Sequence, residues 1–226
     1  MIVYVGDTRS RKLLAALRAE GIGQVAVRGR LSGRRLDPWF YDNGAFEDYR
    51  AGVPFDEAAF RADLAVLDAQ SEPPAFAVLP DVVMGGAESL KLSMRWFEDV
   101  PRRDWYLAVQ NGVEVDDVPW RSGIAGVFVG GDLGWKRATG ARWVEAAHAR
   151  GLRCHVGRVG TVPRIAWARD AGADSIDSSL PLWSNKNMRR FMQALRQSHL
   201  WAPDYRRPEE ATTEKTEKTE KAKANR

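Results

Sequence analysis

The segment 171–180 reads Ala-Gly-Ala-Asp-Ser-Ile-Asp-Ser-Ser-Leu, and its glycine predicts a helix end followed directly by a short strand. Side chains alternate between the two faces of a strand, so Ser175 and Asp177 share one face and Ile176 lies on the other. The strand therefore ends on a carboxylate. Functional sites in parallel α/β folds are built at this end of the strands, although an aspartate here also suits a simple turn cap.

Seven other segments have the composition of strands, and nearly all of them lead into polar or glycine residues. The eight predicted strands are Ile2–Val5, Gln24–Val27, Trp39–Asp42, Ala75–Leu79, Trp105–Val109, Ala125–Val129, Arg153–Val156 and Asp174–Asp177. Amphipathic patterns predict helices at residues 9–20, 56–69, 88–97, 135–150, 163–171 and 185–197. The connections after the second and fifth strands are too short or too polar for a full helix.

This order predicts a compact (β/α)8 barrel of the TIM type with two reduced connections. An open, doubly wound sheet is the alternative. The barrel is favoured because polar or glycine residues follow nearly every strand, as a single ring of loops around one mouth requires.

Size and composition indicate the domain organisation. A chain of 226 residues with 44% hydrophobic and 28% charged residues is long enough for one sizeable core. We expect a barrel domain over residues 1–202 and a disordered tail over residues 203–226, because the Thr-Glu-Lys repeat of the tail has no apolar face to bury. Acidic and basic residues balance between 209 and 226, so the net charge of +4 belongs to the rest of the chain.

The sequence also indicates where the protein acts. No apolar run approaches the length of a membrane-spanning helix, and the first residues predict a strand instead of an export signal. Cys154 is the single cysteine, which excludes an internal disulfide framework and a multi-cysteine metal site. We expect a cytoplasmic protein with no membrane partner and with Cys154 as a small core residue.

Three of the predicted strands lead into an aspartate, namely Asp42, Asp81 and Asp177. A barrel brings these carboxylates to one mouth, together with Gln110 and Asn111 after the fifth strand. Carboxylate pairs suit chemistry at an anomeric carbon, where one group attacks and another manages the proton. An amide pair suits recognition of a nucleobase edge. The three histidines do not have the spacing of metal ligands.

Two polar loops are candidate phosphate sites. The loop after the second strand contains four arginines within eight residues, Arg28, Arg30, Arg34 and Arg35. They predict either a phosphate-binding patch or an ordinary solvated loop. The glycine-rich segment 157–161 after the seventh strand suits a phosphate cradle, or it only turns the chain.

Five segments resemble motifs of the tRNA-guanine transglycosylases and occur in the same order. Residues 42–46, Asp-Asn-Gly-Ala-Phe, are similar to the Asp-Ser-Gly-Gly-Phe of that family, and residues 109–112, Val-Gln-Asn-Gly, to its Val-Gln-Gly-Gly. Segments 126–131 and 157–161 resemble its Gly-Leu-Ala-Val-Gly-Glu and Met-Gly-Val-Gly-Thr. Segment 171–177 resembles Leu-Gly-Val-Asp-Met-Phe-Asp, whose last residue is the nucleophile of the family. The resemblance extends from about Trp39 to Asp177 and implies a barrel.

Departures from the family pattern indicate a branch. Residues 178–200 contain no cysteine, so the zinc site of the tRNA enzymes is missing, and the chain is far shorter than those enzymes. Gly131 stands where the family has Glu, and Arg158 stands where it has Gly. The chain thus looks like the DNA-acting branch, the deazapurine-in-DNA protein A group, which is often encoded by bacteriophages. This resemblance implies exchange of guanine in DNA for a 7-deazaguanine base, without zinc or another cofactor, in a bacterial or phage-infected cell.

The resemblance also implies roles for individual residues. Asp177 would attack C1′ of the target nucleotide, and Asp42 would move the proton at the leaving or incoming base. The residues implied for base binding are Asp81, Gln110, Asn111, Gly130, Gly131 and Phe46. Phe46 and Trp135 suit stacking on an extruded base or, equally, packing in the core.

Basic residues are the expected contacts to the DNA backbone, with RNA as the less favoured partner. They are Arg28, Arg30, Arg34, Arg35, Arg158, Lys186, Arg189 and Arg190. Two other functions remain open. One is a barrel enzyme for a small sugar or phosphate metabolite, and the other is a non-catalytic relic that binds nucleic acid.

Overall fold

The computed structural model describes residues 1–226 apart from 9, 32–34, 103 and 197–226. Eight parallel strands form a closed barrel in chain order, with β8 paired back onto β1 so that Tyr4 lies opposite Asp177. The strands are β1 (Ile2–Val5), β2 (Gly23–Val27), β3 (Trp39–Asp42), β4 (Ala77–Val78), β5 (Trp105–Val109), β6 (Ile124–Val129), β7 (Arg153–Val156) and β8 (Ser175–Asp177). The predicted barrel is therefore confirmed, and the open sheet is excluded.

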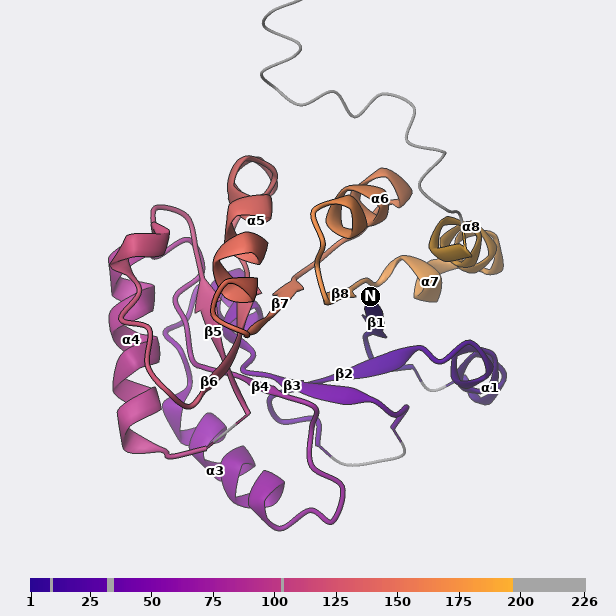
Figure 1. The fold of residues 1–226 in the computed structure, drawn as a ribbon. Coiled ribbons are helices and arrows are strands. Elements are labelled where there is room, and N and C mark those ends of the chain that lie inside the picture. Colours follow the sequence, from indigo (N-terminus) through magenta and orange to yellow (C-terminus); the bar gives the residue numbers. More distant parts are fainter. Residues whose placement is uncertain (9, 32–34, 103, 197–226) are drawn as a thin grey trace, which may run out of the picture. The chain divides into compact units, whose positions relative to one another are not determined.

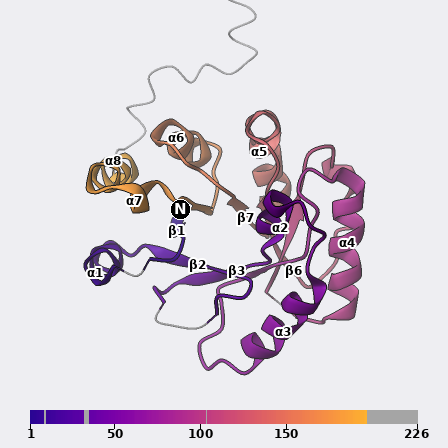
Figure 2. The same ribbon diagram turned by 180° about the vertical axis from the view of Figure 1, so that it is seen from behind.

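Helices surround the strands, as Figures 1 and 2 show. The helices of the described residues are α1 (Arg11–Ala19), α2 (Ala45–Ala51), α3 (Glu57–Asp68), α4 (Gly86–Asp99), α5 (Leu133–His148), α6 (Val162–Asp170), α7 (Leu180–Trp183) and α8 (Asn185–Arg196). Between β2 and β3 the described residues form no helix, and β5 is followed only by the short 3₁₀ turn η1 (Val115–Asp117). Both predicted reduced connections, after the second and fifth strands, are thus confirmed.

Two short helices, α2 and α7, were not predicted from the sequence. The N-cap of α2 is Gly44, which has a left-handed φ of 77° and supplies no side-chain cap, so the usual start signal is missing. Pro181 lies in the first turn of α7, where proline is well tolerated. Helix α2 lies in front of the strands in Figure 2 and carries Phe46 to the barrel mouth.

Aromatic rings fill the interior of the barrel. The ring of Phe40 stacks on that of Phe76 at 4.5 Å, and the ring of Phe76 stacks on that of Tyr106 at 3.8 Å. Glycines on neighbouring strands make room for these rings. A Cβ on Gly126 would lie 2.5 Å from the Tyr106 ring, which is closer than a real contact. The packed rings close the barrel below the mouth and give the site a rigid floor.

A second apolar layer lies between the strands and the helices, and it includes the fully buried Trp96, Trp105 and Trp143. Cys154 is buried, as expected. The described chain up to Leu195 forms one compact unit, whereas the expected domain end at residue 202 and the expected tail at 203–226 lie outside the described residues. Of the helices described, none is long and apolar enough to cross a membrane.

Candidate active site at the barrel mouth

The carboxyl ends of the strands surround one pocket. Its wall includes most of the residues that the sequence predicts for catalysis and base binding, namely Asp42, Phe46, Asp81, Gln110, Gly130, Gly131 and Asp177, and also Arg158, a predicted contact to nucleic acid. The same wall contains Asn43 and Lys136, to which the sequence analysis assigns no role. The structure thus places the three predicted aspartates around one cavity, although they come from strand ends up to 135 residues apart in the chain.

Asp177 ends β8 and receives two hydrogen bonds on one oxygen. Its Oδ1 lies 3.1 Å from Nε2 of His155 and 3.0 Å from the backbone nitrogen of Arg158. Among the described residues, none donates a hydrogen bond to Oδ2. One oxygen of this carboxylate is therefore held in place, and the other is left for a ligand.

The hydrogen bond from His155 holds Asp177 in place, and the sequence analysis did not predict this role. Its side chain is fully buried, and its Nδ1 lies 2.8 Å from Oγ of Ser175. Burial lowers the pKa of His155, which favours a neutral ring that donates from Nε2 to Asp177 and accepts from Ser175. Strand alternation could have indicated this role, because it places His155 on the inward face of β7. In the β7–β8 register His155 lies opposite Ser175.

Asp42 ends β3 in a different environment. Its Oδ1 accepts one hydrogen bond, from the backbone nitrogen of Gly44 at 2.8 Å. Burial raises the pKa of Asp42 from 3.8 to about 7, and the negative charges of Glu47, Asp177 and Asp81 act in the same direction. Near neutral pH this carboxyl group therefore carries a proton in a large fraction of molecules, as a general acid must.

Asp81 follows β4 and is fixed by two amide side chains. Its Oδ1 accepts from Nδ2 of Asn43 at 2.7 Å, and its Oδ2 accepts from Nε2 of Gln110 at 2.5 Å. Burial raises the pKa of Asp81 to about 6, although both amide hydrogen bonds act against that rise. Oε1 of Gln110 in turn accepts from the backbone nitrogen of Met84 at 3.1 Å. These groups form a wall of donors and acceptors with fixed directions.

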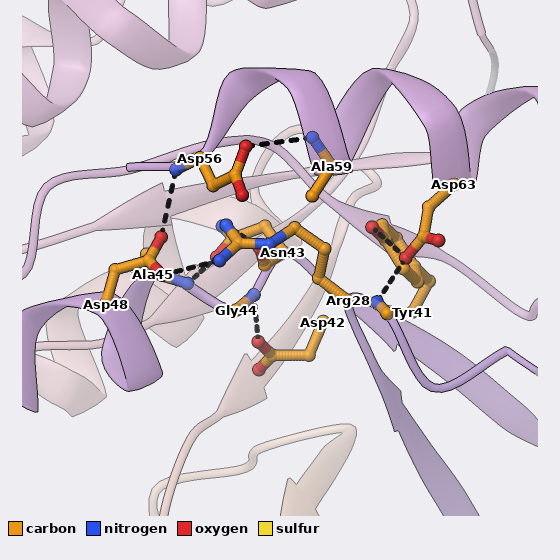
Figure 3. Close-up of polar contacts among 11 residues, drawn as sticks. Arg28, Tyr41, Asp42, Asn43, Gly44, Ala45, Asp48, Asp56, Ala59 and Asp63 are labelled. Atoms are coloured by element: carbon orange, nitrogen blue, oxygen red, sulfur yellow. Dashed lines mark hydrogen bonds and ion pairs between the residues drawn. The ribbon is translucent and has the colours of Figure 1, made fainter. Parts of the chain in front are cut away.

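Figure 3 shows the buried ion pair of Arg28 and Asp48, which holds the backbone at Asn43, one residue of this wall. Arg28 lies 2.6 Å from Asp48 and donates to the backbone oxygen of Asn43 at 3.1 Å. The other oxygen of Asp48 accepts from the backbone nitrogen of Asp56 at 3.1 Å. The Arg28 side chain is only 9% exposed. This corrects the predicted contact of Arg28 with DNA, because its guanidinium group is used to hold the β3–α2 loop.

The other predicted DNA contacts occupy different places. Arg35 lies over the ring of Trp39 at 4.1 Å and donates to Gln70, so it belongs to the amino-terminal end of the barrel, away from the pocket. Arg35 is therefore not part of the pocket wall. Arg34 lies outside the described residues. The remaining predicted cations are exposed, and they are Arg30, Arg158, Lys186, Arg189 and Arg190.

Asn111 also has a different place from the one predicted. Its Nδ2 donates to Asp132 at 2.5 Å, and its Oδ1 accepts from the backbone nitrogen of Asp132 at 2.9 Å. Both ends of the amide therefore connect the β5 and β6 loops instead of facing a base. Gly130 is needed for close packing, since a Cβ there would lie 2.4 Å from Nε2 of Gln110.

An aromatic and a basic residue meet at the rim of the pocket. The guanidinium carbon of Arg158 lies 3.5 Å from the centre of the Phe46 ring. This contact joins the β7 loop to α2 across the pocket. Trp135 instead packs against the core, with its ring 6.3 Å from that of Trp143. Phe46 is thus the better placed of the two predicted stacking residues.

Lys136 completes the wall and is almost fully buried, with 5% of its surface exposed. Its Nζ donates to the backbone oxygen of Gly157 at 2.7 Å. Burial lowers the pKa of Lys136 to about 8. No pattern in the sequence indicated a role for Lys136, because it lies in the first turns of α5 among other charged residues.

No protein-family model matches the chain, and no curated protein matches it significantly. Among the described residues, no group of three or more His, Cys, Asp and Glu side chains could hold a metal ion. The function is therefore inferred from the geometry of the pocket and from the sequence motifs.

Proposed function

We propose that this protein is a glycosyltransferase that exchanges a base of nucleic acid through a covalent aspartyl-glycosyl intermediate. The observation that carries the proposal is one pocket with two aspartates in opposite environments. Asp177 is held as a hydrogen-bond acceptor with one oxygen left open, and Asp42 has a pKa of about 7. A nucleophile and a proton donor are the two groups that retaining glycosyl transfer requires.

The reaction has two matched halves. Oδ2 of Asp177 attacks C1′, the bond between C1′ and the base breaks, and its electron pair leaves with the base. The Asp42 carboxyl group donates its proton to that base as it leaves. An incoming base then returns a proton to the Asp42 carboxylate while its nitrogen attacks C1′ and releases Asp177. The resemblance of the sequence motifs to the DNA-acting transglycosylases implies guanine in DNA as the departing base and a 7-deazaguanine as the incoming base.

The fixed amide wall supports recognition of a purine. Asp81 and Gln110 present acceptors and a donor whose directions are set by Asn43 and Met84 before any ligand enters. Such groups lose little free energy to reorganisation when the base binds. Phe46 lines the pocket with Arg158 over one face of its ring, and a base that enters the pocket has to leave its helical stack.

A small nucleoside is the second candidate substrate, because two of the four predicted loop arginines are taken out of the DNA interface. Arg28 is paired with Asp48, and Arg35 lies at the other end of the barrel. A nucleoside would need the same aspartates but no basic surface.

The deciding experiment is to incubate the full chain with a guanine-containing DNA strand and an isotope-labelled 7-deazaguanine. We expect label in the DNA and a denaturation-resistant protein–DNA adduct when the incoming base is omitted. Parallel reactions use the matching RNA and free deoxyguanosine. Exchange with deoxyguanosine alone would favour the nucleoside enzyme, and absence of both label and adduct from all three substrates would refute the proposal.

A further inference from the structure

Lys136 and Asp177 bind opposite ends of the same peptide group. The carbonyl oxygen of Gly157 accepts from Nζ of Lys136 at 2.7 Å. The nitrogen of that same peptide group, which belongs to Arg158, donates to Oδ1 of Asp177 at 3.0 Å. The peptide is trans, so its C=O and N–H point in opposite directions. An ammonium group and a carboxylate are thus connected through one polarisable amide.

The loop that carries this peptide is built against Asp177. Arg158 has a left-handed φ of 59°, which is unfavourable for a residue with a side chain and aims its N–H at the carboxylate. The next residue, Val159, donates its backbone N–H to the backbone oxygen of Asp177 at 2.8 Å. Gly157 packs so closely on Phe128 that a Cβ there would lie 2.7 Å from its ring. The distance between peptide and carboxylate is therefore fixed from several sides.

Burial of the Lys136 ammonium group costs solvation free energy, which a purely structural residue would not need to lose. A buried ammonium group needs a carboxylate partner or several acceptors to offset the loss of water. None of the ion pairs between described residues includes Lys136, and its hydrogen bond goes to a neutral carbonyl. An apolar side chain would fill the same wall without that cost, so the charge itself indicates a use in the pocket.

We propose that Lys136 is a positioning residue that tunes the nucleophile Asp177 through the Gly157–Arg158 peptide. The proposal rests on the proposed function, whose reaction uses Asp177. The charged ammonium group polarises the carbonyl, which makes the Arg158 N–H a stronger donor. Together with His155 it secures Oδ1, so that Oδ2 is the atom that attacks C1′.

The charges around Lys136 define when this coupling operates. Burial lowers its pKa to about 8; Asp177 and Asp132 favour the charged form, whereas Arg158 and Arg164 disfavour it. Burial lowers the pKa of His155, which also lies near Lys136, and so favours its neutral form. The polarising charge is present below about pH 8 and is lost as the pH rises above that value.

The direct test measures the amide itself and needs no activity. The backbone amide of Arg158 in the full chain is followed by ¹⁵N–¹H NMR between pH 6 and about 10. We expect a shift with a midpoint near 8 in the parent protein and in Lys91→Met, which removes an exposed lysine of α4. The shift should vanish in Lys136→Met. An amide that does not titrate in the parent, or that titrates equally in Lys136→Met, overturns the proposal.

The second test is kinetic. Lys136→Met should slow formation of the DNA adduct roughly tenfold while DNA affinity stays unchanged, and Lys136→Arg, which keeps the charge, should recover most of the rate and lose the alkaline decline. Equal adduct rates for the parent and Lys136→Met would overturn the proposal. If Lys136→Met does not fold, the parent titration and Lys136→Arg decide the question. A titrating amide in a protein that forms no adduct would refute the reaction and leave the coupling intact.

Discussion

The two sides of the pocket treat the same chemical group in opposite ways. On the β3–β4 side, Asp42 and Asp81 are carboxyl groups whose pKa values burial raises to about 7 and about 6. On the β7–β8 side, Asp177 accepts two N–H groups on a single oxygen. In the proposed reaction, it is the environment of each aspartate, and not its residue type, that separates the acid from the nucleophile.

The two sides differ because each strand end places different groups around its carboxylate. Asp42 receives one backbone N–H and has the negative charges of Glu47, Asp81 and Asp177 near it. Asp177 has His155 below it and lies near the cations Arg158 and Lys136. One side therefore favours a protonated carboxyl group at Asp42, and the other supplies hydrogen-bond donors and positive charge beside Asp177.

Replacing Asp177 should produce the largest effect. Asp177→Asn keeps the shape and the hydrogen bond from Arg158 but removes the charge that attacks C1′. Base exchange should fall on the order of 10⁴-fold or more, with DNA affinity and melting temperature close to those of the parent. Incorporation of labelled base measures the rate. Exchange at the parental rate would mean that another carboxylate attacks, and Asp81 would be the next to replace.

Replacing Asp42 should have a smaller effect that depends on the leaving base. Asp42→Asn removes the proton donor, so exchange of guanine should fall by about 10²- to 10⁴-fold. DNA that contains 7-methylguanine offers a base that leaves without being protonated, and adduct formation with it should be close to normal. An equal loss with both bases would contradict the role of Asp42 as an acid.

The same variant should change the pH dependence of stability. The pKa of Asp42 is 3.8 when unfolded and about 7 when folded, so between these values the folded state binds more protons and loses stability as the pH rises. Asp42→Asn should therefore be more stable than the parent at pH 8 by a few kcal/mol, and the difference should vanish below pH 4. Urea unfolding at the two pH values measures it, and a pH-independent difference would exclude this cause.

The barrel and the meeting of the three aspartates were predictable because they depend on local patterns. Alternation along each strand and the polar residue after it are visible in the sequence, and a parallel barrel then brings Asp42, Asp81 and Asp177 to one end. The strand β4 shows the limit of such patterns. Five residues were predicted for it, and only Ala77–Val78 pair as a strand.

The supporting residues were not predictable, because their roles depend on partners far away in the sequence. Arg28 is held by Asp48, which lies on a helix without an N-cap signal. His155 acts through the β7–β8 register, and Lys136 acts through a carbonyl 21 residues further on. In each case the residue type was visible, but the packing that gives it a role was not.

The smallest expected effect concerns basic residues on the outer surface, where α8 can be compared with Arg35. Helix α8 follows β8 closely in the chain, exposes Lys186, Arg189 and Arg190, and contains no acidic residue, whereas Arg35 lies at the opposite end of the barrel. If DNA enters over the mouth on the β8 side, alanine at the three α8 positions should weaken binding and reduce the slope of log affinity against log salt by about 0.7–0.9 for each lost phosphate contact. Arg35→Ala removes one positive charge of the same kind and should leave that slope unchanged. Filter binding of a DNA strand between about 50 and 200 mM salt measures both variants. A slope that falls with Arg35→Ala and not with the α8 variant would place the DNA at the amino-terminal end of the barrel, and the aspartates at the mouth would then need a substrate other than DNA.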